Sequence, residues 1–567
     1  MKHDSTQRGV LIVPEPETLE WDGTTYPFDG FRGFPPSIAR KFGVPSGSWA
    51  ITRNEAEGSG LEVRNGEVVI WGEESVCLAS VVQLLRQFSG CLPAVRIREA
   101  VSFGFRGYHL DIARGAVPLP ATFRRILRLL FLLKYNVFAV YLEDLFPWER
   151  HPRIGAHRGR LDREELSEVI RFGADLGIQV IPSLNLAGHM EHVICLPEYW
   201  PYGEWYRPKE GCLDLSSEKA RDLAYDLLEE VLELWPGEYV HIGGDETWST
   251  GRGKSLDADW SFRGPELYEA HHGRLIELVR AKGREPILWG DMISGTMHMG
   301  DLMSRAMRER WAELLDRDTW HDCTVANWDY SGRPVEHFRA IIGMFKSRGL
   351  RQLACPALSA GERCFPVFAS TLANVRSFFE AARIEGIEGY LVTKWGDVGS
   401  ECLSSLIEPL IAAAAELAVG AESWEAKWRM LSGESEEVLG ARQVIGSEEV
   451  GGRVKHALFR NAQYSSWDEE RRSELLRTWR EALEEVGSLP LPEELDFSRR
   501  LVEAAVRVLE ERISVSDYIA LSRLYSRLWL AERKPEGLDV VVSRFWAAAG
   551  RQDAGLLHDS RGWWSIV

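Results

Sequence analysis

The middle of the chain, from about residue 101 to 418, alternates short apolar segments with longer amphipathic ones. The short segments are rich in β-branched and aromatic residues, whereas the longer ones place apolar residues at the spacing of one helix face. The eight expected strands cover residues 105–113, 136–144, 178–186, 239–246, 286–293, 323–330, 352–359 and 387–395. Eight strand–helix pairs over this length predict an α/β fold of the (β/α)8 type, a TIM barrel.

A doubly wound parallel sheet is the alternative arrangement for alternating strands and helices. Such a sheet rarely needs eight regular repeats. In addition, the phosphate-binding pattern Gly-x-Gly-x-x-Gly does not follow the first expected strand. The barrel is therefore the favoured prediction.

The regions on either side of the barrel have different patterns. Residues 61–72 read as strand, Asn-Gly turn and strand, and residues 75–88 as an amphipathic helix, which predicts a non-catalytic α+β domain over residues 1–100. The barrel is expected over residues 101–420, followed by a linker and an α-helical domain over 421–567. The Gly-, Ser- and Glu-rich stretch 431–452 is the expected linker.

The expected helices of the last domain cover residues 468–486, 497–513 and 517–534. Each combines mixed charges with an apolar stripe, which is typical of a solvated bundle. We expect this bundle to pack either on the barrel or on another subunit, so a homodimer is one of the two arrangements that the pattern allows.

Composition and charge narrow the function classes. The chain has 567 residues, of which 45% are hydrophobic and 27% charged, as in a soluble globular protein. Its net charge of −18 argues against nucleic acid or an anionic membrane as the main partner. Only four consecutive apolar residues precede Pro14, and later apolar runs are too short for a membrane span, which predicts a cytoplasmic protein. Eight scattered cysteines without a Cys-x-x-Cys pair predict buried thiols rather than disulfides or a zinc site.

The most informative run is residues 239–248, where an apolar strand meets two glycines and then Asp245 and Glu246. In a (β/α)8 barrel the C-terminal ends of the strands carry the chemistry. The alternative interpretation is a helix N-terminus, where acidic residues complement the dipole. The other strand ends favour the first interpretation.

Carboxylates, one arginine, one histidine and several aromatic residues occupy the other expected strand ends. They are Asp111, Arg114, Glu143, Asp144, Trp148, Asn185, His189, Trp289, Asp291, Trp328, Asp329, Tyr330, Trp395 and Asp397. The set lacks the spacing of metal ligands and of a Ser/His or Cys/His nucleophile, so no metal and no cofactor are expected. Carboxylates that hold hydroxyl groups and transfer protons, with aromatic walls, suit a pyranose ring instead.

Glycoside hydrolysis usually employs two carboxylates that flank the scissile bond. Asp245 and Glu246 are adjacent in sequence, which makes the usual division into nucleophile and acid difficult. A better fit makes Glu246 the general acid, while Asp245 holds a substrate group that itself attacks.

The chain resembles the exo-acting β-N-acetylhexosaminidases of glycoside hydrolase family 20 over about residues 1–420. The central match is His241-x-Gly-Gly-Asp245-Glu246. Further matches are Leu110-Asp111-x-x-Arg114, Lys134-x-Asn136, Leu142-x-Asp144-x-x-x-Trp148, Gly188-His189, Trp289-Gly-Asp291 and Trp395-Gly-Asp397. The helical C-terminal part resembles a subgroup of intracellular members.

This resemblance implies roles for individual residues in a retaining, substrate-assisted hydrolysis. Glu246 would protonate the glycosidic oxygen, and Asp245 would orient the 2-acetamido group that attacks C1 to give an oxazolinium ion. The resemblance further implies that Tyr330 bonds the acetamido oxygen, that His189 and Asp144 form a pair beside Glu246, and that Arg114 holds the sugar hydroxyls. It implies a pocket walled by Trp289, Trp328 and Trp395, with Asp397 on O4 or O6. The implied substrates are glycans that end in β-linked GlcNAc or GalNAc.

Two alternatives remain at this point. One is an endo-acting or disaccharide-releasing enzyme on the same barrel, which product analysis would distinguish. The other is a catalytically silent sugar-binding protein, against which the retention of Asp245 and Glu246 argues, because a binding protein needs no acid.

Overall fold

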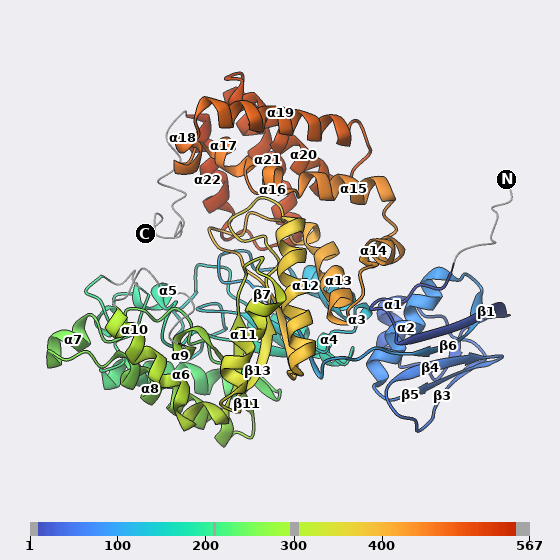
Figure 1. The fold of residues 1–567 in the computed structure, drawn as a ribbon, viewed down its shortest axis with the longest axis horizontal. Helices are drawn as coiled ribbons and strands as arrows, with labels where there is room; N and C mark the ends of the chain where they lie inside the picture. The colour runs from blue at the N-terminus through green and yellow to red at the C-terminus, as the bar shows by residue number, and fades with distance from the viewer. Residues whose placement is uncertain (1–8, 208–210, 295–304, 551–567) are drawn as a thin grey trace.

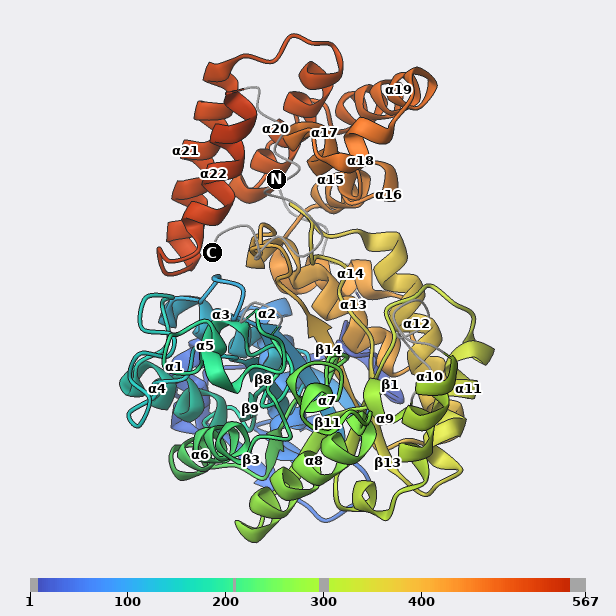
Figure 2. The same cartoon turned by 90° about the vertical axis from the view of Figure 1, so that its left-hand side faces the viewer.

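A computed structural model describes residues 9–207, 211–294 and 305–550 of the chain. Figures 1 and 2 show a central barrel with the N-terminal sheet on one side and the C-terminal helices over another. The predicted fold class is confirmed. The limits of the three predicted domains stay predictions, and their outer ends, residues 1–8 and 551–567, lie outside the described residues.

The barrel is a closed ring of eight strands, β7 to β14, in which every pairing is parallel. β7 and β8 are buried along their whole length, because helices cover the outside of the ring. All eight expected strands are present. They are β7 (Phe105–Asp111), β8 (Val137–Tyr141), β9 (Gln179–Ser183), β10 (Tyr239–His241), β11 (Glu285–Trp289), β12 (Thr324–Trp328), β13 (Arg351–Cys355) and β14 (Gly389–Lys394).

A helix follows each barrel strand on the outside of the ring. These helices are α3 (Pro120–Leu132), α4 (Arg163–Ala174), α6 (Glu218–Leu234), α8 (Gly264–Ala281), α10 (Arg305–Ala312), α11 (Val335–Lys346), α12 (Phe368–Glu385) and α13 (Glu408–Ala418). Local sequence fixes several helix starts. Asp162, for example, caps α4 and forms a reciprocal capping box with Glu165.

The N-terminal part is a six-stranded sheet in the order β1-β6-β4-β5-β3-β2. The expected hairpin is present as the antiparallel pair β4 and β5, and α2 (Glu74–Gln87) matches the expected helix. The strands are β1 (Thr18–Pro27), β2 (Phe31–Arg32), β3 (Trp49–Arg53), β4 (Gly60–Arg64), β5 (Glu67–Trp71) and β6 (Cys91–Arg98), with α1 (Pro36–Phe42) after β2. The buried ion pair of Lys134 with Glu99 joins this sheet to the barrel.

The C-terminal part is helical, including the stretch that the sequence predicted to be a linker. Within residues 431–452 the structure has α15 (Glu436–Ile445) and α16 (Glu448–Gly451). The serines and glycines of this stretch occupy helix ends: the Ser435 side chain accepts from Val438 N, and Gly433 ends α14 (Trp424–Ser432) in a left-handed conformation. The prediction of a linker was therefore wrong because these residues cap helices.

The expected C-terminal helices are present as α19 (Glu469–Val486), α20 (Glu493–Leu509) and α21 (Val515–Glu532). The part also contains α17 (Val454–Phe459), α18 (Ala462–Ser466) and α22 (Leu538–Ala549). In the described residues, no helix combines the length and the apolar character that crossing a membrane requires. All eight cysteines are free, and each is buried or partly buried as predicted.

Residues 533–537, between α21 and α22, cross the barrel at the loops that follow β7, β8 and β14. The backbone N–H of Lys534 donates to Val117 O at 2.8 Å, and its Nζ lies 2.6 Å from Glu165 Oε2. The Arg533 guanidinium donates to the carbonyl oxygen of Ser400 at 2.7 Å. Because these loops carry the strand-end residues, the C-terminal part is attached directly to the framework of the site.

Candidate active site

The strand-end residues gather at one mouth of the barrel. Asp111, at the end of β7, organises one side of this mouth: its Oδ2 accepts from Arg114 Nη1 at 3.0 Å and from the backbone N–H of Gly396 at 2.8 Å. The guanidinium of Arg114 lies 4.9 Å from the centre of the Tyr141 ring and 5.6 Å from that of Trp395. Its five N–H groups are thus oriented by a buried carboxylate and two rings, which suits a clamp on sugar hydroxyls.

Asp245 and Glu246 follow β10 in very different surroundings. Asp245 is buried, whereas the Glu246 side chain is 35% exposed. Burial tends to raise the pKa of Asp245, but the charge of His189 and its hydrogen bond outweigh this, so the pKa lies below its usual value. Asp245 is therefore an ionised, fixed carboxylate, and Glu246 stands at the open side of the site.

Three residues of this part of the site have an unusual backbone. Glu246, His189 and Glu143 have φ values of 48°, 51° and 44°, in the left-handed region that residues other than glycine seldom adopt. Strained backbone of this kind concentrates at functional sites, where the surrounding structure holds it. All three follow barrel strands β8, β9 and β10 and so lie at the barrel mouth.

Asp291 supports the backbone of Glu246. Its Oδ2 accepts from Glu246 N at 2.9 Å, and its Oδ1 accepts from Trp328 Nε1 at 3.2 Å. Burial and the charge of the nearby Asp245 raise the pKa of Asp291 to about 8. The sequence placed Asp291 at a strand end but assigned it no role. The signal in the sequence that could have indicated this role is the place of Asp291 in the motif Trp289-Gly-Asp291.

The expected pair of His189 with Asp144 is not formed. Asp144 Oδ1 accepts from Arg158, and its Oδ2 lacks a hydrogen-bond partner among the described residues. His189 Nε2 lies instead 3.4 Å from Asp245 Oδ2 and 3.5 Å from Glu246 Oε2. In this structure Asp144 thus pairs with Arg158, which the motifs do not include, and His189 faces the two acids that follow β10.

The aromatic residues divide between the wall and the floor of the site. Trp328 stacks on Tyr330 with ring centres 4.9 Å apart, and Trp395 Nε1 donates to the Tyr330 hydroxyl at 2.7 Å. Trp289 has no exposed surface and lies 5.9 Å from Trp395, centre to centre. The prediction that Trp289 walls the pocket was therefore wrong: it forms the floor beneath Trp395, inside the barrel.

Asp397 lies in the loop after β14, on the same side as Arg114. It is half-buried, and burial raises its pKa while the charge of Arg114 opposes the rise. A cavity of about 390 Å³ adjoins this side of the site, between the barrel mouth and the start of α22. Arg114, Arg158, Glu191, His192, Glu536 and Asp539 are among its lining residues.

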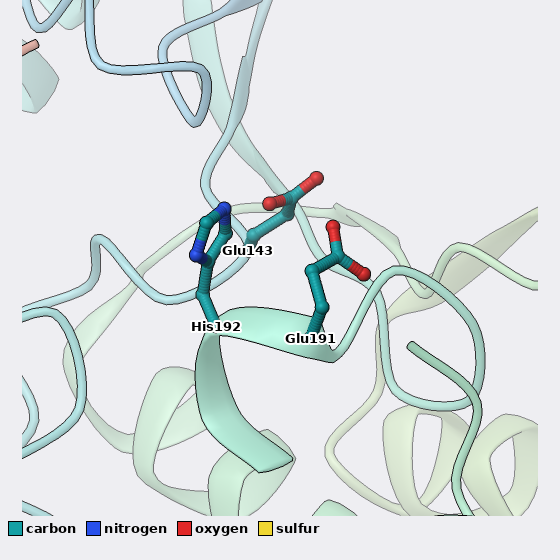
Figure 3. Close-up of side chains that lie close together, drawn as sticks. All are labelled: Glu143, Glu191 and His192. Carbon is teal, nitrogen blue, oxygen red and sulfur yellow. The ribbon is translucent and has the colours of Figure 1, made fainter. Parts of the chain in front are cut away.

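Glu143, Glu191 and His192 form a second polar group, next to Arg114. Figure 3 shows Glu191 and His192, both on α5 (Glu191–Ile194), reaching toward Glu143 from the loop after β8. One ligand-type atom from each of the three lies within 4.8 Å of the others, a grouping that can hold a metal ion in proteins. Arg114 Nη2, however, stands 3.4 Å from Glu143 Oε1, and a neighbouring cation disfavours a bound one.

The mouth of this eight-stranded parallel barrel combines carboxylates, an arginine and aromatic rings, groups that suit the binding of a sugar. Residues 103–329 match the model of the "Glycosyl hydrolase family 20, catalytic domain". This segment, which includes barrel strands β7 to β12, is therefore similar to the catalytic domain of that family.

Curated relatives match part of the chain. A beta-hexosaminidase of Vibrio furnissii is 29% identical over 263 residues, which cover 38% of this chain and 43% of the relative. Hexosaminidase D of Bos taurus is 28% identical over 192 residues, covering 33% and 55%. The matched part thus spans about half or less of the length of these relatives.

Solved structures share the fold at low sequence identity. The beta-N-acetylhexosaminidase of Bacteroides fragilis superposes with a TM-score of 0.57 at 18% identity, covering 75% of this chain and 94% of that one. The GH20 enzyme of Streptomyces coelicolor A3(2) gives a TM-score of 0.55 at 18% identity, covering 78% and 96%. These likenesses extend the shared fold beyond the segment that the family model matches.

Proposed function

We propose that the chain is an exo-acting β-N-acetylhexosaminidase that removes terminal, non-reducing, β-linked GlcNAc or GalNAc. The observation that carries this proposal is the contrast between Asp245 and Glu246. One carboxylate is buried and held ionised by His189, and its neighbour is partly exposed. The names of the matched relatives support the same activity.

The proposed reaction retains configuration and has two steps. Glu246 donates its proton to the glycosidic oxygen while the substrate's acetamido oxygen attacks C1, so the C1–O bond breaks and an oxazolinium ion forms. Glu246, now a carboxylate, removes a proton from water, which attacks C1 and reopens the ring. Asp245 stabilises the positive charge on the acetamido nitrogen in both steps. The reaction balances without a cofactor.

Substrate binding in this proposal employs the groups around the two acids. Arg114 and Asp397 lie on one side and bind the ring hydroxyls, while Trp328, Trp395 and Tyr330 face the acetamido group. Because Trp395 Nε1 already donates to the Tyr330 oxygen, the tyrosine hydrogen is available for the acetamido oxygen.

The decisive test compares chromogenic β-GlcNAc and β-GalNAc substrates with the wild-type chain and with Glu246→Gln and Asp245→Asn. We expect each substitution to lower kcat by several orders of magnitude while circular dichroism stays unchanged. Turnover like that of the wild type in either variant would overturn the assignment of roles.

Release of a disaccharide is a second candidate, which the cavity beside Arg114 favours, because that cavity offers room beyond the terminal sugar. Product analysis on an oligosaccharide separates the two: stepwise loss of single N-acetylhexosamines supports the exo-acting enzyme. A cytoplasmic location and a homodimer formed through the C-terminal helices stay predictions.

A further inference from the structure

A chain of polar contacts connects Arg114 with Asp245 across four neighbouring barrel strands. Arg114 Nη2 lies 3.4 Å from Glu143 Oε1, and this oxygen is 3.0 Å from the Tyr141 hydroxyl. The Tyr141 hydroxyl is in turn 2.7 Å from the side-chain amide of Asn185. The residue that would clamp the sugar hydroxyls is thus connected to the one that would orient the acetamido group.

The orientation of the Asn185 amide follows from its neighbours. With its nitrogen toward the strand-end groups, it donates to Leu184 O at 2.9 Å and to Asp245 Oδ1 at 3.1 Å, and its oxygen accepts from the Tyr141 hydroxyl at 2.7 Å. In the reverse orientation the amide oxygen would face only other acceptors. The single hydrogen of the Tyr141 hydroxyl therefore goes to Asn185.

The hydrogen between Tyr141 and Glu143 must then come from Glu143. A tyrosine hydroxyl has one hydrogen and two lone pairs, so after donating to Asn185 it can only accept from its second partner. An ionised carboxylate cannot donate. The 3.0 Å contact between Glu143 Oε1 and the Tyr141 oxygen is a hydrogen bond only if Glu143 carries a proton.

We propose that Glu143 is held as a neutral carboxylic acid, and that its donated hydrogen bond positions Asp245 through Tyr141 and Asn185. Glu143 is a positioning residue, because it acts on the reaction through Asp245. This inference rests on the proposed function for its effect on catalysis, whereas the protonation itself is independent of the substrate.

The surroundings of Glu143 favour the neutral form. Its side chain is 2% exposed, and Glu191, a second buried carboxyl group, stands beside it (Figure 3). Arg114 and Arg158 are the nearby arginines, but each already bonds another carboxylate, Asp111 or Asp144. Two buried carboxyl groups thus lie beside arginines that also bond other carboxylates, and a proton on one of them relieves their repulsion.

Charged and titratable groups approach Glu143 from three barrel strands and their loops. They are Asp111 at the end of β7 and Arg114 after it, Tyr141, Asp144 and Arg158 on β8 or its loop, and His189, Glu191 and His192 after β9. Burial has the largest effect and raises the pKa of Glu143 to about 8; the charges of Arg114 and His189 oppose the rise, and those of Glu191 and Asp111 add to it.

Three substitutions separate a neutral Glu143 from an ionised one. Glu143→Gln replaces the acid by a neutral group that still donates to Tyr141, so we expect it to lower kcat by less than about tenfold. Glu143→Ala and Tyr141→Phe each interrupt the chain and are expected to lower kcat by about 10- to 100-fold. Circular dichroism and thermal unfolding identify any variant that fails to fold.

The pH profile provides a readout that a purely structural role would not change. In the wild type, raising the pH through the pKa of Glu143 removes its hydrogen and lowers kcat. Glu143→Gln cannot ionise, so the part of the alkaline loss that comes from Glu143 should be absent from its profile. Infrared difference spectroscopy at pH 6 tests the proton without substrate: wild type minus Glu143→Gln should show the carbonyl stretch of one protonated carboxyl group.

Two results would overturn the inference. If Glu143→Gln loses as much activity as Glu143→Ala and the carboxyl band is absent, Glu143 is an anion paired with Arg114. If a chelator lowers wild-type kcat and Mg²⁺ or Zn²⁺ restores it, the three side chains of Figure 3 hold a cation instead. A wild-type chain that hydrolyses no β-N-acetylhexosaminide would overturn the proposed function, while the infrared band would still report on the proton.

Discussion

The imidazole Nε2 of His189 lies 3.4 Å from Oδ2 of Asp245. The same nitrogen stands 3.5 Å from Glu246 Oε2, so one ring faces both proposed catalytic carboxylates. Burial alone would lower the pKa of His189, but the charge of Asp245 and the hydrogen bonds to both carboxylates raise it well above its usual value. His189 is therefore an imidazolium ion, and its charge keeps the buried Asp245 ionised.

Replacing His189 should displace the acid side of the pH profile. In His189→Gln the positive charge is lost, so burial is no longer opposed and the pKa of Asp245 rises. Activity needs ionised Asp245 and should then appear only at higher pH. We expect kcat/KM near pH 6 to fall about 10- to 100-fold, with partial recovery as the pH is raised.

Full pH profiles of kcat/KM for wild type and His189→Gln check this expectation. His321→Gln is the matched control, since His321 is exposed on the outside of the barrel, and its profile should coincide with that of the wild type. An unshifted acid limb in His189→Gln would mean that Asp245 does not depend on the imidazolium.

The bond from Trp395 to Tyr330 should appear as coupling between the two residues. Trp395→Phe keeps an aromatic ring but removes the N–H that orients the Tyr330 hydroxyl, and Tyr330→Phe removes the hydroxyl itself. If Tyr330 acts through the oriented hydroxyl, the second substitution should cost less once the first is present. We expect a coupling of about 1 kcal/mol in a double-mutant cycle on kcat/KM. Trp546→Phe, on the exposed face of α22, should show none.

The barrel could be predicted because its signal is repeated and local. Parallel strands covered by helices are apolar runs, and the order of apolar runs and amphipathic helices fixes the closed ring. The clustering of Asp245, Glu246 and Arg114 followed from the ring, since strand ends of one barrel meet at one mouth.

Other features of the site depend on contacts that no motif encodes. Arg158 lies in a loop between β8 and α4, and only the folded chain shows that it pairs with Asp144. Trp289 and Trp395 occupy similar motif positions, yet one is buried in the barrel and the other faces the mouth. Residues 533–537 are distant in sequence from Arg114. No local sequence pattern therefore predicts that they pack against the loop that carries it.

The attachment of residues 533–537 should fail when Gly537 acquires a side chain. Gly537 has φ 86°, and a Cβ at this position would lie 2.4 Å from the carbonyl oxygen of Gly115, the residue after Arg114. Both the left-handed backbone and the clash with a backbone atom are unfavourable for alanine. We expect Gly537→Ala to destabilise the chain by about 2–4 kcal/mol and to raise KM, because the loop that carries Arg114 must move.

Gly433→Ala is the matched control for Gly537→Ala. Gly433 has φ 77°, but a Cβ there would meet no atom within 4 Å, so only the backbone strain remains. We expect a loss of about 1–2 kcal/mol and an unchanged KM. Urea unfolding measures the first quantity and initial rates the second. Equal losses of stability in the two variants would show that the Gly115–Gly537 contact contributes little.

A thiazoline that mimics the oxazolinium ion tests whether the substrate supplies the nucleophile. The thiazoline ring should bind the wild type tightly, because ionised Asp245 faces the position of the acetamido nitrogen in the proposed complex and stabilises its positive charge. Asp245→Asn removes that charge and should weaken binding by about 100-fold or more, whereas Glu246→Gln, whose side chain acts on the leaving group, should weaken it much less.

Isothermal titration calorimetry measures the affinity of the thiazoline for both inactive variants directly. Equal affinities in the two variants, or indifference of the wild type to the thiazoline, would place the nucleophile on the enzyme and argue against substrate assistance.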